Sequence, residues 1–202
     1  MTKTKIGRPR SEKSQEAIIA ATHKLLNEFG GAGLSIEKIA KEAKVGKPTI
    51  YRWWPSLADI VLDALLGQAK SKIKIPTHDS FEKNLNFFLQ QSIKAILDGA
   101  GPHLQFLMAQ AQINDEFRER FRDNFVSKRR EVLSSLLKQY KQKEQTASET
   151  KVNIETLVDI IFGSMWYRLL VGHAPLDQSF ADELTQLALN SMSISTPTQN
   201  EQ

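Results

Sequence analysis

The chain of 202 residues carries 27 Lys and Arg against 23 Asp and Glu and contains no cysteine. Without cysteine, a disulfide framework, a thiolate zinc site and a cysteine nucleophile are all excluded. The first residues are polar and basic, and no run approaches the roughly 18 uninterrupted apolar residues of a membrane helix. We therefore expect a cytoplasmic globular protein with no membrane partner.

Charge is distributed unevenly along the chain. Residues 1–54 hold 11 Lys and Arg against 5 Asp and Glu, a net charge of +6, whereas residues 55–202 hold 16 against 18, a net charge of −2. A basic quarter followed by a slightly acidic remainder favours a region that contacts nucleic acid. A chance cluster of solvated lysines is the alternative that charge alone leaves open.

Apolar residues recur with a helical period from end to end, and the alternation typical of strands is missing. We therefore expect an all-α fold of about nine helices, whose starts are set by capping side chains and whose ends are set by glycine or proline. The predicted caps are Ser35, Asp79, Asn114, Asn153 and Ser179. The predicted helices span 12–29, 36–44, 47–54, 57–74, 80–98, 103–113, 115–142, 154–172 and 180–192.

These helices divide the chain into a basic head over residues 1–54 and a helical body over residues 55–192. The polar tail over residues 193–202 is predicted to be disordered. Within the head, the turn at Lys44-Val45-Gly46 joins two helices into a helix-turn-helix, whose second helix lies in the DNA major groove.

The short helix over residues 47–54 has the chemistry of a DNA-reading helix. Ile50 and one tryptophan must face inward, because they lie three or four residues apart. Lys47, Thr49, Tyr51 and Arg52 are then left outside, and cations and hydroxyls are what phosphate oxygens and base acceptors require. The alternative is an ordinary three-helix corner whose outer face happens to be basic.

The segment Val45-Gly46-Lys47-Pro48-Thr49-Ile50-Tyr51-Arg52-Trp53-Trp54, with the two helices before it, resembles the DNA-binding domain of TetR-family regulators. The resemblance implies a homodimeric repressor that binds a palindromic operator on double-stranded DNA. It also implies that residues 55–192 bind a small effector and dimerise through their last two helices. The chain departs from the family pattern at Gly46, where Ser is common, and at Leu57, where Lys is common.

The resemblance places Lys47 and Thr49 at base or phosphate contacts and Tyr51 at a phosphate contact. A basic arm carrying Arg8 and Arg10 could enter the minor groove, and an unstructured solubilising terminus is its alternative. Glu37 repels phosphate, although a carboxylate can accept a hydrogen bond from cytosine N4. The predicted DNA-contacting residues are Arg8, Arg10, Ser35, Lys47, Pro48, Thr49, Tyr51, Arg52 and Trp53.

Aromatic residues in the body could line an effector cavity between helices, although at helical spacing they are more often plain core. The predicted ligand-binding residues are Phe87, Phe88, Phe106, Gln110, Phe121, Trp166 and Tyr167. The predicted dimer-interface residues on the last two helices are Gly163, Arg168, Phe180, Leu184 and Leu187. The alternative is that these helices pack only within the monomer. Arg168 could instead receive an effector carboxylate, or pair with an acid such as Asp177 across the interface.

The sequence argues against an enzyme, because no catalytic motif is present and the four histidines (His23, His78, His103 and His173) stand far apart. We expect no metal and no cofactor. The predicted function is that of a sequence-specific transcriptional regulator, most simply a repressor that a small apolar effector releases from its operator. The alternatives are an activator, and a constitutive or architectural DNA-binding protein without an effector.

Overall fold

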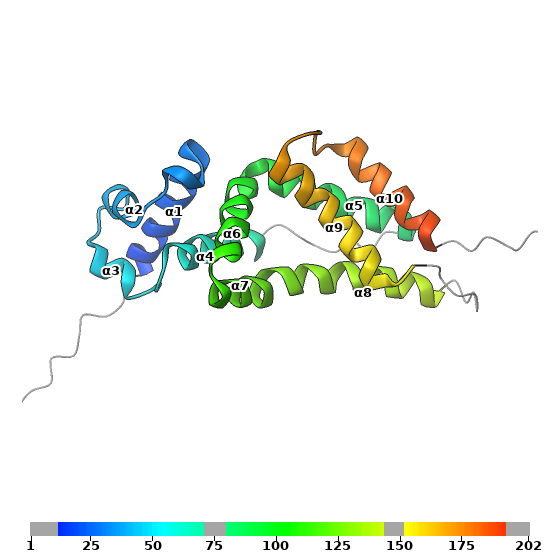
Figure 1. The fold of residues 1–202 in the computed structure, drawn as a ribbon, viewed down its shortest axis with the longest axis horizontal. Coiled ribbons are helices and arrows are strands. Elements are labelled where there is room, and N and C mark those ends of the chain that lie inside the picture. The colour runs from blue at the N-terminus through cyan, green and yellow to red at the C-terminus, as the bar shows by residue number, and fades with distance from the viewer. Residues whose placement is uncertain (1–11, 71–79, 144–151, 193–202) are drawn as a thin grey trace, which may run out of the picture. The chain divides into compact units, whose positions relative to one another are not determined.

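The computed structural model describes residues 12–70, 80–143 and 152–192, and all regular structure in these residues is helical (Figure 1). This confirms the predicted all-α fold. The α-helices are α1 (Glu12–Phe29), α2 (Ile36–Glu42), α3 (Lys47–Tyr51), α4 (Leu57–Lys70), α5 (Phe81–Ala95), α6 (Gly101–Ile113), α7 (Asp115–Phe121), α8 (Ser127–Lys143), α9 (Ile154–Val171) and α10 (Gln178–Met192). A short 3-10 turn, η1 (Gly31–Gly33), and two π-helical turns, η2 (Ile96–Ala100) and η3 (Arg122–Val126), lie between them.

Three of the predicted helix caps are confirmed. Ser35 Oγ accepts a hydrogen bond from the Lys38 backbone N–H at 3.3 Å. Asn114 Oδ1 accepts a hydrogen bond from the Phe117 backbone N–H at 2.9 Å, and Asn153 Oδ1 accepts one from the Glu155 backbone N–H at 2.8 Å. Each cap satisfies a backbone donor that the first turn of a helix leaves without a partner.

The start of α10 differs from its predicted position. Asp177, rather than Ser179, caps α10, because its Oδ1 accepts from the Phe180 backbone N–H at 2.9 Å. Ser80 caps α5 through the Lys83 backbone N–H at 3.2 Å, and the predicted cap Asp79 lies outside the described residues. Two side-chain oxygens lay within reach of the start of α10, and sequence spacing alone could not choose between them.

Glycines end α1 and separate α5 from α6 for conformational reasons. Gly30 adopts a φ of 66° after the last turn of α1, and Gly99 adopts a φ of 119° inside the turn η2. Both values lie in a region that L-residues with a side chain rarely occupy. The predicted helix over residues 115–142 is present as α7 and α8, joined through η3.

The helices form two compact units, which do not follow a single cut in the sequence. The first unit contains residues 1–68 and 102–117, so α6 packs with the helices of the head. Gly31 lies so close to Phe106 of α6 that an added Cβ atom would be 2.8 Å from the Phe106 ring. The fully buried aliphatic residues of this unit include Ile18, Leu26, Ile39, Ile50, Ile60 and Leu107.

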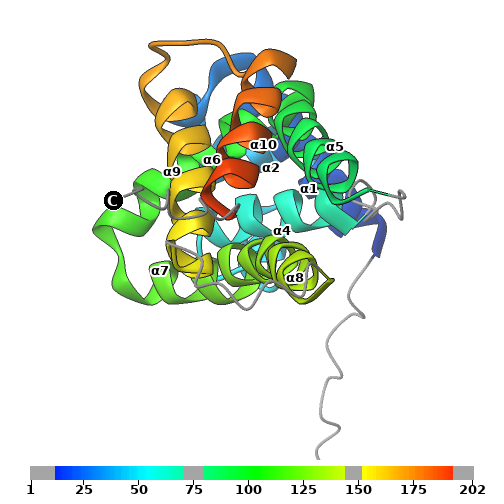
Figure 2. The ribbon, with the colours of Figure 1, turned by 90° about the vertical axis from the view of Figure 1, so that its right-hand side faces the viewer.

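The second unit contains residues 69–101 and 118–202. In it, α5 packs against α10 and α8, and α8 also packs against α9. Figure 2 shows α10 beside both α5 and α9. The most deeply buried side chains of the second unit include Leu85, Phe88, Leu89, Leu133, Leu137, Val158 and Ile161. None of the helices in the described parts of the chain is long and apolar enough to cross a membrane.

Candidate nucleic-acid interface

The helices α2 and α3 meet through a turn that backbone hydrogen bonds fix. Lys44 adopts a φ of 53°, which reverses the chain, and the Val45 N–H donates to the Ala40 carbonyl at 3.0 Å. Gly46 then takes an extended conformation, and its carbonyl accepts from the Thr49 N–H at 2.9 Å, which begins α3. Because Pro48 lacks a backbone donor and has a helical φ, it suits this first turn.

Two inward-facing side chains hold α3 in the first unit. Ile50 is completely buried, and Trp54, just after α3, is 5% exposed. The Trp54 Nε1–H donates to Asp63 Oδ2 of α4 at 3.1 Å, which fixes the indole at the end of the motif. Trp53 is half-buried, and its ring centroid lies 6.0 Å from that of Trp54.

The rest of α3 therefore faces outward. Lys47, Tyr51 and Arg52 are exposed, and Thr49 is half-buried. Pro48 is also exposed, whereas Ser35 is occupied as the cap of α2. The structure thus brings four of the nine predicted DNA-contacting residues onto α3, and Arg52 follows directly as its C-cap. Arg8 and Arg10 lie outside the described residues.

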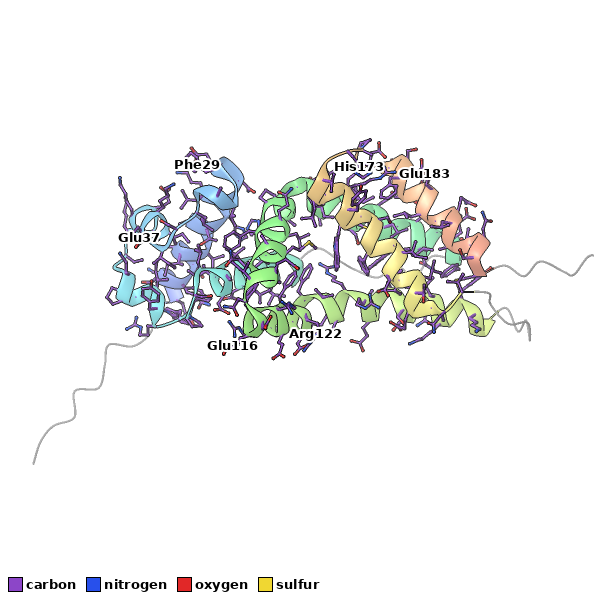
Figure 3. All side chains as sticks on the ribbon, viewed as in Figure 1. Phe29, Glu37, Glu116, Arg122, His173 and Glu183 are labelled. Carbon is purple, nitrogen blue, oxygen red and sulfur yellow. The ribbon has the colours of Figure 1, made fainter. Side chains whose placement is uncertain are left out.

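The outward face of α3 carries an ion pair. Lys47 Nζ donates to Glu37 Oε1 of α2 at 2.6 Å. Figure 3 labels Glu37 where its side chain leaves α2. The hydrogen bond from Lys47 lowers the pKa of Glu37, and the same bond raises the pKa of Lys47, so both groups keep their charge at neutral pH.

Two known protein families match the sequence of this chain, one over the helix-turn-helix and one over the residues after it. The family described as "Bacterial regulatory proteins, tetR family" matches residues 18–64, and the one described as "Tetracyclin repressor-like, C-terminal domain" matches residues 75–188. The second match alone covers more than half of the chain. The chain belongs to the TetR family. It is a DNA-binding transcriptional regulator and not an enzyme, as the sequence predicted.

Individual TetR-family proteins are similar along nearly the whole chain. The HTH-type transcriptional regulator YdeS of Bacillus subtilis is 28% identical over 197 residues, which cover 98% of both chains. The crystal structure of the regulator SCO0332 has a TM-score of 0.70 at 24% identity, over 91% of this chain and 100% of that one. FadR of Bacillus subtilis, solved with stearoyl-CoA, has a TM-score of 0.68 at 16% identity, over 88% and 99%. At these identities the two structures show a shared fold.

The predicted effector-binding residues of this TetR-family chain divide between the two units. Phe106 and Gln110 lie in the first unit, where the Phe106 ring packs against Gly31. The remaining five residues lie in the second unit, where Phe88 and Phe121 are buried and Tyr167 is exposed. Aromatic spacing therefore identified core positions as readily as candidate pocket walls.

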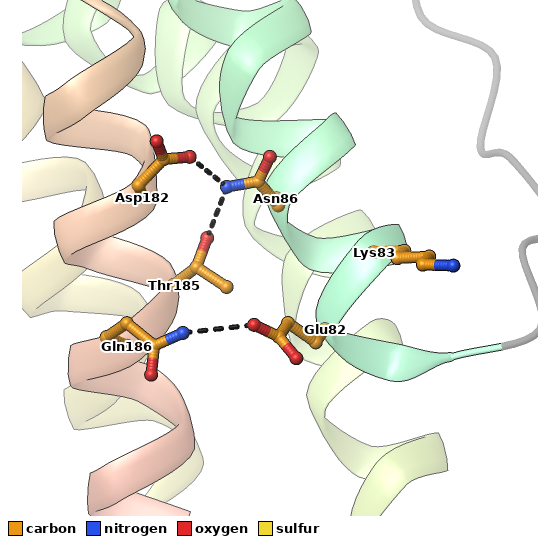
Figure 4. Close-up of a pocket in the computed structure, with 6 residues that line it drawn as sticks. All are labelled: Glu82, Lys83, Asn86, Asp182, Thr185 and Gln186. Atoms are coloured by element: carbon orange, nitrogen blue, oxygen red, sulfur yellow. Dashed lines mark hydrogen bonds between the residues drawn. The ribbon is translucent and has the colours of Figure 1, made fainter.

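A polar groove of about 410 Å³ lies between α5 and α10 in the second unit, and no sequence pattern pointed to it. Asn86 of α5 donates to Asp182 at 2.7 Å and to Thr185 at 3.2 Å, both on α10. Gln186 donates to Glu82 at 3.0 Å, while Lys83 points away from the other side chains (Figure 4). These hydrogen bonds join α5 to α10 across the groove.

The predicted dimer-interface residues face in different directions. Phe180 and Leu184 are buried within the second unit, whereas Gly163 and Leu187 are exposed. Arg168 donates to the Pro175 carbonyl at 2.7 Å, and its Nη2 lies 3.8 Å from Glu183 Oε2. Figure 3 labels His173 and Glu183 near the connection of α9 to α10.

Sequence reasoning assigned Tyr167 to the effector site and missed the other exposed apolar residues of α9. Ile160, Tyr167, Leu170 and Val171 are between 43% and 58% exposed, on the side of α9 opposite its buried residues. The buried side of α9 is formed by Leu157, Val158, Ile161 and Met165. Because α9 is apolar on both sides, its period alone could not tell inside from outside.

A histidine pair was also missed. His23 Nδ1 of α1 and His103 Nε2 of α6 lie 2.7 Å apart in the first unit, and His103 is completely buried. The two residues are 80 positions apart, so no local motif could pair them. Among the described residues, no group of three or more His, Asp or Glu side chains is arranged to hold a metal ion.

Proposed function

We propose that this TetR-family regulator is a cytoplasmic repressor that binds a palindromic operator as a homodimer and leaves it when a small, mainly apolar effector binds. The observation that carries the proposal is the outward face of α3, where Lys47, Thr49, Tyr51 and Arg52 stand on a helix anchored by Ile50. Such a face provides donors for phosphate oxygens and for base acceptors in the major groove.

The dimer is proposed from the exposed apolar surface of the second unit. We define the α9 face as Ile160, Gly163, Tyr167, Leu170 and Val171. Leu187 of α10, 42% exposed, is a further candidate. A contiguous apolar surface of this kind marks an association site in a protein whose other exposed residues are mostly polar. A twofold interface buries the same face on both protomers.

Gly163 supports close packing at the α9 face. A Cβ atom added there meets no atom within 4 Å in the protomer, so glycine is not required by the chain's own packing. Glycine at an exposed position in the middle of a helix costs roughly 1 kcal/mol relative to alanine. Gly163 therefore leaves room for the close approach of a second helix.

The apolar effector is proposed from the interior of the second unit and from a structural relative. Phe88, Phe121, Phe125 and Phe162 give this unit an aromatic interior, and Trp166 stacks on Phe162 with ring centroids 5.7 Å apart. FadR of Bacillus subtilis, whose fold is similar, is solved with stearoyl-CoA. An effector with a long hydrocarbon chain is therefore the first class to test.

The experiment is a titration of duplex binding with fatty acids and acyl-CoA thioesters of graded chain length, beside Trp166 fluorescence. We expect one chain-length range to quench or shift the fluorescence and to weaken duplex binding at least about fivefold, since allosteric coupling is typically 1–3 kcal/mol. Trp166→Phe assigns the signal. If no compound changes duplex affinity, the constitutive DNA-binding alternative replaces the effector-controlled repressor.

A further inference from the structure

The pair of Lys47 and Glu37 joins the first residue of α3 to the start of α2 on the outward face of the helix-turn-helix. The side chain of Lys47 is 51% exposed and that of Glu37 is 62% exposed, so both remain accessible while they are 2.6 Å apart. A carboxylate is unexpected on a surface that approaches a polyanion, because it repels phosphate.

The pair is held by contacts on the α2 side. Ser35 caps α2 through the Lys38 backbone N–H at 3.3 Å and so fixes the first turn that carries Glu37. On the other side, the turn bond from Val45 to Ala40 fixes where α3 begins. Glu37 is therefore preorganised beside Lys47.

A paired lysine is a poor choice for a phosphate anchor. Glu37 offsets the charge of Lys47, so the two together attract a phosphate less than Lys47 alone. The pair still has hydrogen-bonding capacity: the Lys47 ammonium has three donors and uses one on Glu37 Oε1. The second carboxylate oxygen of Glu37 is likewise free of Lys47.

We propose that Glu37 and Lys47 together read one G·C base pair in each operator half-site, with Lys47 donating to guanine and Glu37 accepting from cytosine. In the major groove, guanine presents two adjacent acceptors, N7 and O6, and the cytosine N4 amino donor lies next to them. Two donors beside one acceptor form the complement of that edge. The proposal rests on the proposed placement of α3 in the major groove.

A competing role for Glu37 is that it only moderates the charge of α3. These two roles predict different behaviour when the carboxylate is removed. A moderator, once removed, leaves a stronger cation that tightens binding to every duplex and steepens the salt dependence. If Glu37 instead reads a base, the protein without its carboxylate loses its base preference at one position of the site.

The test is selection of duplexes from a random palindromic library, followed by affinity measurements on the selected site and its base-substituted versions. The proteins are the natural chain, Glu37→Ala, Glu37→Gln and a control, Glu42→Gln. Glu42 of α2 pairs with Lys24 of α1 at 2.7 Å in the same unit, so the control removes an equivalent exposed ion pair and the same charge.

For the natural chain we expect a G·C pair at one symmetric position in each half-site, preferred at least about fivefold over the other pairs. Glu37→Ala should reduce that preference to less than about twofold, and Glu37→Gln should shift it toward adenine, which pairs with amides. Glu42→Gln should leave it unchanged.

Uniformly tighter binding by the Glu37 variants, with base preferences unchanged, would overturn the proposal and assign Glu37 the moderating role. An A·T pair at the position whose preference Glu37→Ala abolishes would also overturn it. Failure to select any duplex with the natural chain is a different result, since it contradicts the placement of α3 in the major groove itself.

Discussion

The helices α3 and α9 are each buried on one side and exposed on the other, but they present opposite chemistry to the solvent. Lys47, Tyr51 and Arg52 stand on the outer side of α3, whereas Tyr167, Leu170 and Val171 stand on that of α9. The inner sides are alike, since Ile50 and Ile161 are both completely buried. Burial explains why each helix packs, and only the exposed side distinguishes a surface for a polyanion from a surface for another protein chain.

Breaking the α9 face should give the largest effect. Leu170→Glu places a carboxylate in the proposed apolar contact, and Gly163→Leu fills the space for a second helix. We expect monomers by sedimentation velocity and duplex affinity lower by about a hundredfold or more, because an unpaired charge is costly to bury and one half-site binds weakly.

Gly67→Leu is the matched control for Gly163→Leu. Gly67 is also an exposed helical glycine with nothing within 4 Å of an added Cβ atom. The Gly67→Leu protein should remain dimeric. A Gly163→Leu protein that stays dimeric and binds duplex normally contradicts the assignment of the α9 face as the interface.

Breaking the outer side of α3 should have a smaller effect that spares the dimer. Arg52→Ala removes an exposed cation from the helix, so duplex affinity should fall by about tenfold for every sequence alike. The slope of log affinity against log salt should become less steep by roughly 0.9 for each phosphate that the variant no longer neutralises. Sequence-dependent weakening would instead make Arg52 a base-reading residue.

Acid should weaken the attachment of α9 to α8. Glu155 of α9 accepts from Ser134 Oγ at 3.0 Å and lies 3.2 Å from Arg130 Nη2, and these contacts lower its pKa from the ordinary 4.5, the Ser134 hydrogen bond most. A lowered folded-state pKa stabilises the fold above pH 4.5, and this contribution is lost as the pH falls below it.

Glu155→Gln should therefore lower Tm slightly at pH 7, and the difference should shrink as the pH falls below 4.5 and the Glu155 carboxylate takes up a proton. The expected difference at pH 7 is about 0.2–1 kcal/mol, as for exposed ion pairs. Glu131→Gln, an exposed carboxylate on α8, is the control. A Tm difference that grows as the pH falls contradicts the sign of the shift.

The smallest effect is expected from improving the start of α3. Gly46 caps α3 without a side-chain hydrogen bond, at a φ of −77° that any residue adopts, and an added Cβ atom would lie 3.5 Å from Pro48 Cδ, an ordinary contact. Gly46→Ser should raise the unfolding free energy by a few tenths of a kcal/mol, because its hydroxyl supplies a cap. Gly46→Ala adds the same Cβ atom without the hydroxyl, so it should be the less stable of the two by thermal denaturation.

Local signals made much of α3 predictable and much of α9 unpredictable. The reversing turn before Gly46 and Pro48 in the first turn set where α3 begins, and its inner and outer sides followed from the spacing of Ile50 and Trp54. The helix ends at Tyr51, earlier than the predicted residue 54. No equivalent signal exists in α9, where Ile160 and Ile161 are adjacent in sequence but only Ile160 is exposed.

Long-range contacts were the other limit of sequence reasoning. His23 meets His103, and Asn86 meets Asp182, across 80 and 96 positions. The bond from Arg168 to the Pro175 carbonyl in the loop after α9 was also not predicted. These contacts depend on how helices pack, which the period of a single helix does not contain.

Sedimentation velocity of the protein with a selected duplex, at increasing salt concentration, tests most directly whether α3 binds DNA while the α9 face holds the dimer. We expect two protomers per duplex at low salt, and then free duplex with an intact protein dimer as salt rises, because phosphate contacts are screened while apolar contacts are not. Two results would contradict the assignment of DNA binding to α3 and of dimerisation to the α9 face. One is a dimer that dissociates at the same salt concentration at which it releases the duplex, and the other is duplex binding that does not change with salt.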